Sequence, residues 1–167
     1  SHVSVVPNHQ LNRKTPLHTR ANVAYFGTFG YELDLNKLSD EEISELKQQI
    51  TFMKEYRELI QFGTFYRLKS PFEGNETAWM TVSEDKKTAL VFWYRERNVV
   101  NADFTRVRLQ GLDPDLIYRN EYNGTENYGD ELMNLGLLTT DCTAGEPTSE
   151  DEPCTDYESR IYVLTAK

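Results

Sequence analysis

Two pairs of carboxylates are the strongest candidates for acid–base chemistry in this sequence. Glu32 stands two positions before Asp34, and Asp130 directly precedes Glu131. A general acid and a general base must face each other across a substrate, which residues one or two positions apart on a strand or turn rarely do. We therefore predict that both pairs serve helix entry or turn formation, and we predict no catalytic residue in this chain.

Three histidines raise the question of a metal site. His2, His9 and His18 lie close together in sequence, but their spacing fits neither one face of a helix nor a zinc finger. Gly27 and Gly30 resemble part of a phosphate-binding loop, yet the third glycine and the immediate helix start are missing. We predict no metal site and no cofactor.

Cys142 and Cys154 flank eleven residues inside an acidic stretch, residues 139–158, which contains no lysine or arginine. A disulfide between them would constrain the loop and is typical of an oxidising compartment, whereas two thiols are typical of a reducing one. The sequence leaves both alternatives open. We interpret the stretch as a solvent-facing insertion.

The composition excludes several classes of partner. The chain has 167 residues, of which 38% are hydrophobic, enough to fill a core. Its 18 basic and 27 acidic residues give a net charge of −9. A nucleic acid or an anionic membrane needs a positive surface, so neither is expected as the main partner. No apolar run approaches the roughly 18 residues of a transmembrane helix.

One long amphipathic helix, predicted over residues 39–62, separates two different parts of the chain. Ser39 and Glu42 have the spacing of a capping box, and Gly63 stands where a left-handed glycine commonly ends a helix. Apolar residues recur at spacings of three and four, which predicts one buried stripe: Ile43, Leu46, Ile50, Met53, Tyr56 and Ile60.

The part before this helix has the pattern of an incomplete parallel sheet. Residues 1–22 lack periodicity and predict a loop. Residues 23–35 begin with an apolar run typical of a strand that is buried on both faces. A single strand followed by a long helix is one βα unit, so we expect its partner strands elsewhere.

From residue 64 onward, short segments rich in aromatic and β-branched residues alternate with turns, which predicts an antiparallel β-sandwich. Trp79, Trp93 and Tyr94 are predicted to be core residues, with sugar stacking as the alternative. Residues 128–137 are predicted to be rich in loops. The predicted strands are residues 64–68, 77–83, 88–97, 105–112, 116–122 and 159–166.

Several stretches together resemble bacterial-type α-galactosidases of glycoside hydrolase family 36. They are SHVSVVPNHQ, FGTFGYELDLNKLS, EYRELIQFGTFYRL, SPFEGNETAWM, YGDELMNLGL and SRIYVL. The resemblance runs from residue 1 to about 138 and resumes at 157–164, while the cysteine-bearing insertion departs from it. It implies a retaining enzyme that releases terminal α-linked galactose from melibiose, raffinose and stachyose.

The resemblance also implies a mainly β fold, in which the last strand and long helix of a (β/α)8 barrel precede a C-terminal antiparallel β-sandwich. Residues 1–63 would be the end of the barrel, with residues 1–22 as the loop after the seventh strand and 23–35 as the eighth strand. Residues 64–167 would be the sandwich, including the insertion at 139–158. The family's two catalytic aspartates lie on earlier barrel strands, so this chain alone is expected to be inactive.

Barrel active sites are built at the carboxyl ends of the strands, so His2, Ser4 and Tyr31 are expected at the edge of the substrate pocket. The expected partners are the remainder of the α-galactosidase polypeptide, galactosides, and further copies in a homo-oligomer. The expected location is cytoplasmic, although a disulfide between Cys142 and Cys154 would favour an extracellular one. The alternatives are a carbohydrate-binding or interaction module and an independent enzyme.

Overall fold

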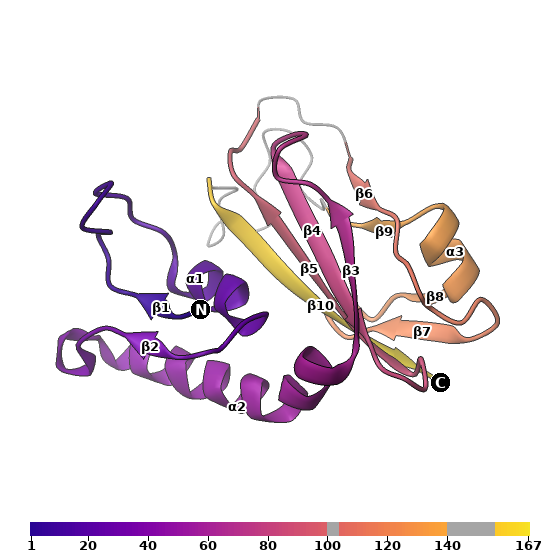
Figure 1. The fold of residues 1–167 in the computed structure, drawn as a ribbon, viewed down its shortest axis with the longest axis horizontal. Helices are drawn as coiled ribbons and strands as arrows, with labels where there is room; N and C mark the ends of the chain where they lie inside the picture. Colours follow the sequence, from indigo (N-terminus) through magenta and orange to yellow (C-terminus); the bar gives the residue numbers. More distant parts are fainter. Residues whose placement is uncertain (100–103, 140–155) are drawn as a thin grey trace. The chain divides into compact units, whose positions relative to one another are not determined.

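The computed structural model describes residues 1–99, 104–139 and 156–167, which form two compact units (Figure 1). The first unit runs from Ser1 to Gln61 and the second from Phe62 to Lys167. The second unit is dominated by antiparallel sheet, and the fold is mainly β, as predicted. None of the helices in these described ranges is long and apolar enough to cross a membrane.

The first unit alternates strands and helices. Strand β1 (Val3–Ser4) precedes helix α1 (Leu17–Tyr25), and strand β2 (Tyr31–Glu32) precedes a short 3-10 helix (Leu35–Lys37) and the long helix α2 (Asp40–Phe62). The two strands pair in parallel, with Val3 opposite Tyr31 and Ser4 opposite Glu32. The order is therefore strand, helix, strand, helix, with a helical crossover of the kind that parallel strands require.

The predicted strand at residues 23–35 and the predicted loop at 1–22 are each only partly correct. Helix α1 occupies the start of the apolar run, where Ala21, Ala24 and Tyr25 are buried, and only Tyr31 and Glu32 are in strand. A short apolar run does not distinguish a buried strand from a buried helical segment by its periodicity. Pro16 at the N-cap position of α1 marks the helix start.

Helix α2 is capped as predicted. The Ser39 backbone N–H donates to the Glu42 carboxylate at 2.9 Å, and the Glu42 N–H donates to the Ser39 hydroxyl at 3.2 Å. The buried stripe is displaced from the prediction, because Gln49 is buried beside Leu46 whereas Ile50 is 37% exposed. Gly63 is not among the described glycines with a positive φ, so the predicted left-handed cap is also wrong.

The second unit is built on a six-stranded antiparallel sheet in which β10, the last strand of the chain, lies at an inner position. The strand order is β3-β4-β5-β10-β7-β8. Over most of its length β10 pairs with β5, from Glu158 opposite Arg95 to Thr165 opposite Thr88. The strands are β3 (Thr64–Lys69), β4 (Glu76–Val82), β5 (Thr88–Arg95), β7 (Ile117–Asn120), β8 (Glu126–Tyr128) and β10 (Glu158–Ala166).

One face of this sheet packs against a smaller second layer. That layer contains strand β6 (Arg106–Val107), helix α3 (Gly129–Asn134) and strand β9 (Leu137–Leu138), with β6 and β9 paired antiparallel. The shared core has members from both layers: Met80, Val91, Trp93, Tyr162 and Leu164 from the sheet, and Val107, Leu109, Leu112, Leu132 and Leu137 opposite them. The unit is thus a β-sandwich with one large and one small sheet.

Most predicted strands of the second unit are confirmed, and two details are wrong. Strands β3, β4, β5, β7 and β10 lie where the alternating pattern places them. Only two residues of the predicted strand at 105–112 are in strand, and the stretch at 128–137 contains helix α3 rather than loop alone.

Candidate functional site

Three polar side chains share one face of the strand pair: Ser4 and Glu32 end strands β1 and β2, and His2 directly precedes β1. Ser4 lies opposite Glu32 in the register, and His2 is two residues before Ser4, so it lies on the same face. The His2 Nε2 atom is 2.6 Å from the Glu32 carboxylate, and both side chains are more than half exposed. This His2–Ser4–Glu32 face offers hydrogen-bonding groups to a ligand.

Tyr31 lies on the opposite face of the strand pair. Its hydroxyl donates to the side-chain carbonyl of Gln49 on α2 at 3.0 Å, and the Gln49 amide donates to the Glu45 carboxylate at 2.8 Å. The Phe29 ring packs edge-on against the Tyr31 ring. Burial, with a smaller effect of the Glu45 charge, raises the pKa of Tyr31 to about 12. The structure therefore separates Tyr31 from His2 and Ser4.

Arg20 on α1 fixes the exit of strand β1. Its guanidinium donates one hydrogen bond to the Ser4 carbonyl oxygen and another to the Thr15 carbonyl oxygen, the latter at 3.1 Å. Burial lowers the pKa of Arg20, an effect opposed by the charges of Glu42 and Glu45. No motif marked Arg20 in the sequence, because both of its partners are backbone atoms.

Asp34 and Asp130 stabilise helix starts, as predicted, whereas Glu32 instead forms an ion pair with His2. Asp34 accepts a hydrogen bond from the Asn36 backbone N–H at 3.1 Å at the start of the 3-10 helix. Asp130 accepts from the Glu131 N–H at 2.6 Å in the first turn of α3. Negative charge is favourable at both positions because it faces the positive end of a helix dipole.

The structure describes the three histidines but not the cysteine pair, because Cys142 and Cys154 lie outside the described residues. Within the described ranges, no group of three or more His, Cys, Asp and Glu side chains is arranged to hold a metal ion.

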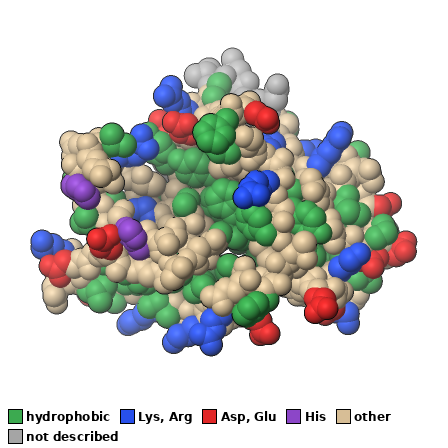
Figure 2. All heavy atoms as spheres, in the orientation of Figure 1, with side chains coloured by type: hydrophobic (Ala, Val, Ile, Leu, Met, Phe, Trp, Pro, Cys, Tyr) green, Lys and Arg blue, Asp and Glu red, His purple; other side chains and the backbone are tan. Residues whose placement is uncertain are grey.

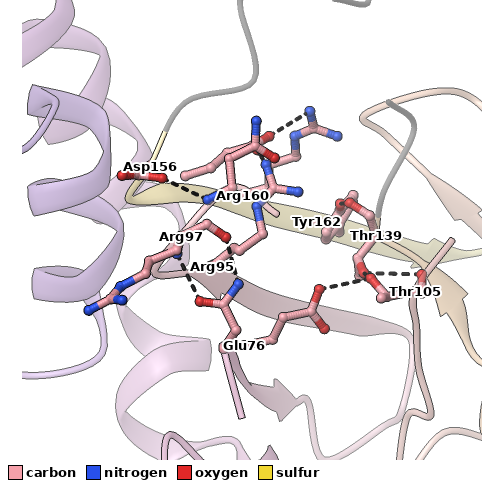
Figure 3. Close-up of polar contacts among 11 residues, drawn as sticks. Glu76, Arg95, Arg97, Thr105, Thr139, Asp156, Arg160 and Tyr162 are labelled. Carbon is pink, nitrogen blue, oxygen red and sulfur yellow. Dashed lines mark hydrogen bonds and ion pairs between the residues drawn. The ribbon is translucent and has the colours of Figure 1, made fainter. Parts of the chain in front are cut away.

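A polar network connects the large sheet to the second layer (Figure 3). The Thr105 hydroxyl donates to the Glu76 carboxylate at 2.8 Å and lies 3.2 Å from the Thr139 hydroxyl. The Tyr162 hydroxyl donates to the Thr139 carbonyl oxygen at 3.2 Å, and Lys69 forms an ion pair with Glu76. Each of these polar groups has a partner, which stabilises the positions of β6 and β9.

A second part of the network pairs buried charges at the start of β10. Glu158 bridges the guanidinium groups of Arg95 and Arg160, with 2.9 Å to Arg160 (Figure 3). Arg95 is only 5% exposed. Its charge is compensated by the carboxylate and by the face of the Trp93 ring, 5.5 Å away. An unpaired charge here would be costly, so this cluster is structural.

The aromatic residues predicted to be core or sugar-stacking lie on different faces of the large sheet. Trp93 is fully buried in the core, which confirms its predicted place. Trp79 is half-buried on the other face, where its ring stacks on Phe92 with 4.0 Å between centroids. Tyr94 follows Trp93 and therefore points away from the core. The three rings do not form one flat surface.

Charge is distributed without a region of single sign on the face shown in Figure 2, where acidic and basic side chains are interspersed with hydrophobic ones.

The chain matches two family models that together cover most of its length. Residues 1–63 match the Melibiase model, and residues 76–164 match the model of the glycosyl hydrolase family 36 C-terminal domain. The chain belongs to glycoside hydrolase family 36. The resemblance noted in the sequence is therefore confirmed.

Relatives of this family 36 chain are α-galactosidases. Alpha-galactosidase AgaA of Geobacillus stearothermophilus is 53% identical over 137 residues, which are 82% of this chain and 19% of the relative. Alpha-galactosidase 1 of Pediococcus pentosaceus is 44% identical over 166 residues, 99% of this chain and 21% of the relative. The chain thus spans about a fifth of the length of the curated relatives it matches.

Solved structures agree with this relationship. A crystal structure of a variant of the Geobacillus stearothermophilus AgaA with 1-deoxygalactonojirimycin matches all of this chain and 22% of its own length, with a TM-score of 0.90 and 45% identity. The α-galactosidase from Lactobacillus brevis matches with a TM-score of 0.89 and 42% identity, again over 100% of this chain and 22% of that one.

Proposed function

We propose that this family 36 chain is the C-terminal part of a retaining α-galactosidase that hydrolyses terminal α-D-galactosyl residues of melibiose- and raffinose-type oligosaccharides. The relatives named above support the reaction. AgaA variants crystallised with raffinose and with stachyose are 46% identical to this chain, which supports the substrate class.

The observation that carries the proposal is the parallel pairing of β1 with β2 in the order strand, helix, strand, helix. Successive units of this kind build a (β/α)8 barrel. We assign β1 and β2 to its seventh and eighth strands and α2 to its last helix. The other strands and both catalytic carboxyl groups then come from the remainder of the polypeptide. A retaining mechanism requires those groups at roughly 5–5.5 Å from each other.

Within this proposal the His2–Ser4–Glu32 face edges the substrate pocket. Ser4 and Glu32 end their strands, and barrel enzymes build their active sites at the carboxyl ends of the strands. His2 joins them through its ion pair with Glu32. Arg20 is a positioning residue, because it holds the Ser4 carbonyl oxygen and so fixes where β1 ends. Tyr31 supports the pocket from behind through α2 rather than lining it.

A chimeric enzyme tests the proposal. The C-terminal segment of the Geobacillus AgaA that matches this chain is replaced by this chain, and raffinose hydrolysis is followed by proton NMR. We expect galactose to be released first as the α anomer, because a retaining enzyme preserves the configuration. Light scattering on the same preparation tests the predicted homo-oligomer.

AgaA without its C-terminal segment is the control and should be inactive, as should this chain alone on a chromogenic α-galactoside. A folded but inactive chimera, first release of the β anomer, or turnover by this chain alone would contradict the proposal.

A further inference from the structure

A pocket of about 510 Å³ opens on the second unit, at the edge of the large sheet formed by β3 and β4 and the loop between them. This volume lies in the range of small-molecule sites, roughly 300–1,000 Å³. The pocket is lined by residues of the second unit, whereas the His2–Ser4–Glu32 face belongs to the first. The lining residues that matter here are Phe65, Arg67, Ser70, Phe72, Glu73 and Trp79.

Three of these side chains share the face of the sheet that points away from the core. Arg67 on β3 lies opposite Trp79 on β4, and Phe65 lies two residues before Arg67. The alternate residues of β4, Ala78 and Met80, point into the core. A register shift follows Arg67, and such a bulge bends a strand and re-aims its side chains. The sheet thus supplies two rings and a guanidinium to one wall.

The wall of the pocket is held in place by neighbouring contacts. The Trp79 ring stacks nearly parallel on Phe92, with 18° between the planes. The Thr77 hydroxyl donates to the Lys69 carbonyl oxygen at 3.0 Å across the bulge, and Lys69 forms its ion pair with Glu76. A wall that is already ordered loses little conformational entropy when a ligand binds.

The rim carries groups that are available to a ligand. Phe72 is 95% exposed at the tip of the loop. The Arg67 guanidinium lies 5.6 Å from the Phe65 ring centroid. In the part of the chain that the structure describes, the Arg67 and Glu73 side chains make no hydrogen bond or ion pair with another residue. Arg67 supplies five N–H donors and Glu73 two acceptor oxygens.

We infer that this pocket is a second, non-catalytic saccharide site that binds a neutral pyranose. The electron-rich faces of Phe72 and Trp79 suit the C–H face of a sugar ring, and Arg67 and Glu73 suit its adjacent hydroxyl groups. The ligand is neutral because the Arg67 and Glu73 charges cancel, as do those of Lys69 and Glu76. The site requires nothing of the barrel, so it stands apart from the proposed function.

Indole NMR resonances of the 167-residue chain report on this site, because the sequence has two tryptophans. Trp79 lines the pocket and Trp93 is fully buried in the core. We expect melibiose to shift the Trp79 indole resonance in a saturable way and to leave that of Trp93 in place. A Trp79→Phe variant assigns the two resonances. Sorbitol, a polyol without a ring, should have no effect.

Phe72→Ala should weaken melibiose binding roughly 2- to 10-fold, the loss expected for one aromatic contact. Phe62→Ala is the matched control, because Phe62 is 82% exposed and does not line the pocket. Arg67→Ala gives a second variant should Phe72→Ala alter the amide spectrum. No shift with melibiose, an equal shift with sorbitol, or equal weakening by Phe62→Ala would overturn the inference. A shift of Trp79 on dilution without sugar would instead identify the pocket as a contact between copies of the chain.

Discussion

Tyr31 on β2 is joined to Gln49 on α2 by a hydrogen bond of 3.0 Å from the phenol hydroxyl to the side-chain carbonyl oxygen. Gln49 is only 5% exposed. A buried polar group is costly without a partner, and Gln49 has Tyr31 for its oxygen and Glu45 for its amide. This relationship fixes the strand against the helix and accounts for a polar residue inside the buried stripe of α2.

Tyr31→Phe should lower the free energy of unfolding by about 1–3 kcal/mol, because it leaves the buried Gln49 oxygen without its donor. Urea denaturation followed by circular dichroism measures the effect. Tyr128→Phe removes the same atom from a ring that is 52% exposed and should change little. Equal effects of the two substitutions would show that the Tyr31 hydrogen bond contributes nothing specific.

Stability should also fall at high pH through Tyr31. Burial raises its pKa from the ordinary 10.0 to about 12, so the folded state holds the phenol proton more tightly than the unfolded state. The corresponding stabilisation is complete below pH 10 and is lost as the pH rises from 10 to about 12. Tyr25 acts in the same direction, because burial raises its pKa too. Urea midpoints measured across this range should fall less for Tyr31→Phe than for the unaltered chain.

Ser39→Ala should destabilise the chain by about 1 kcal/mol, since it removes the side-chain acceptor of the Glu42 N–H at the start of α2. Ser44→Ala, at an exposed position inside the same helix, is the control and should be neutral or slightly stabilising because alanine favours helix. Thermal unfolding of both variants makes the comparison. Equal melting temperatures would rule out a stabilising capping box.

His2→Ala in the chimeric enzyme should raise KM for raffinose roughly 3- to 10-fold with little change in kcat, as expected when an interaction common to substrate and transition state is lost. The exposed pair of His2 with Glu32 contributes at most about 1 kcal/mol to stability, so the melting temperature should stay nearly constant. His18→Ala, at an exposed position on helix α1, is the matched control. Unchanged kinetics for His2→Ala would remove His2 from the pocket edge.

Cys142 and Cys154 should both react with iodoacetamide without prior reduction in a chain isolated under non-reducing conditions. This outcome follows from the expected cytoplasmic location, where thiols stay reduced. Intact mass before and after reduction gives the number of alkylated cysteines. Alkylation only after reduction would establish a disulfide and favour an oxidising compartment.

The sequence predicted the second unit well because its strands are specified locally. Strands β4 and β5 are rich in aromatic and β-branched residues, and turn-forming residues separate the strands. Helix α3 was not predicted, because it has only six residues, which is fewer than two helical turns. A pattern with period 3.6 needs a longer segment than that to stand out from a loop.

The first unit was harder to predict, since its core is formed by contacts between segments far apart in sequence. The Tyr25 ring packs on Phe52, 4.8 Å between centroids, and that contact favours helix where the apolar run alone suggested strand. Asp34 and Asp130 were assigned correctly because helix capping depends on neighbouring residues. Arg20 was not predicted because both of its partners are backbone carbonyl oxygens, which every residue type carries.

On each side of residues 140–155, a nearby residue forms a backbone hydrogen bond with another part of the β-sandwich. Thr139 donates its N–H to the Thr105 carbonyl oxygen at 3.1 Å, and Tyr157 donates to that of Glu96 at 2.9 Å. Both anchors join described residues of the second unit. Lengthening a connection costs only about 0.6 kcal/mol for each doubling, so an epitope tag or a reporter peptide can be grafted between these anchors without shifting the register of β9 or β10.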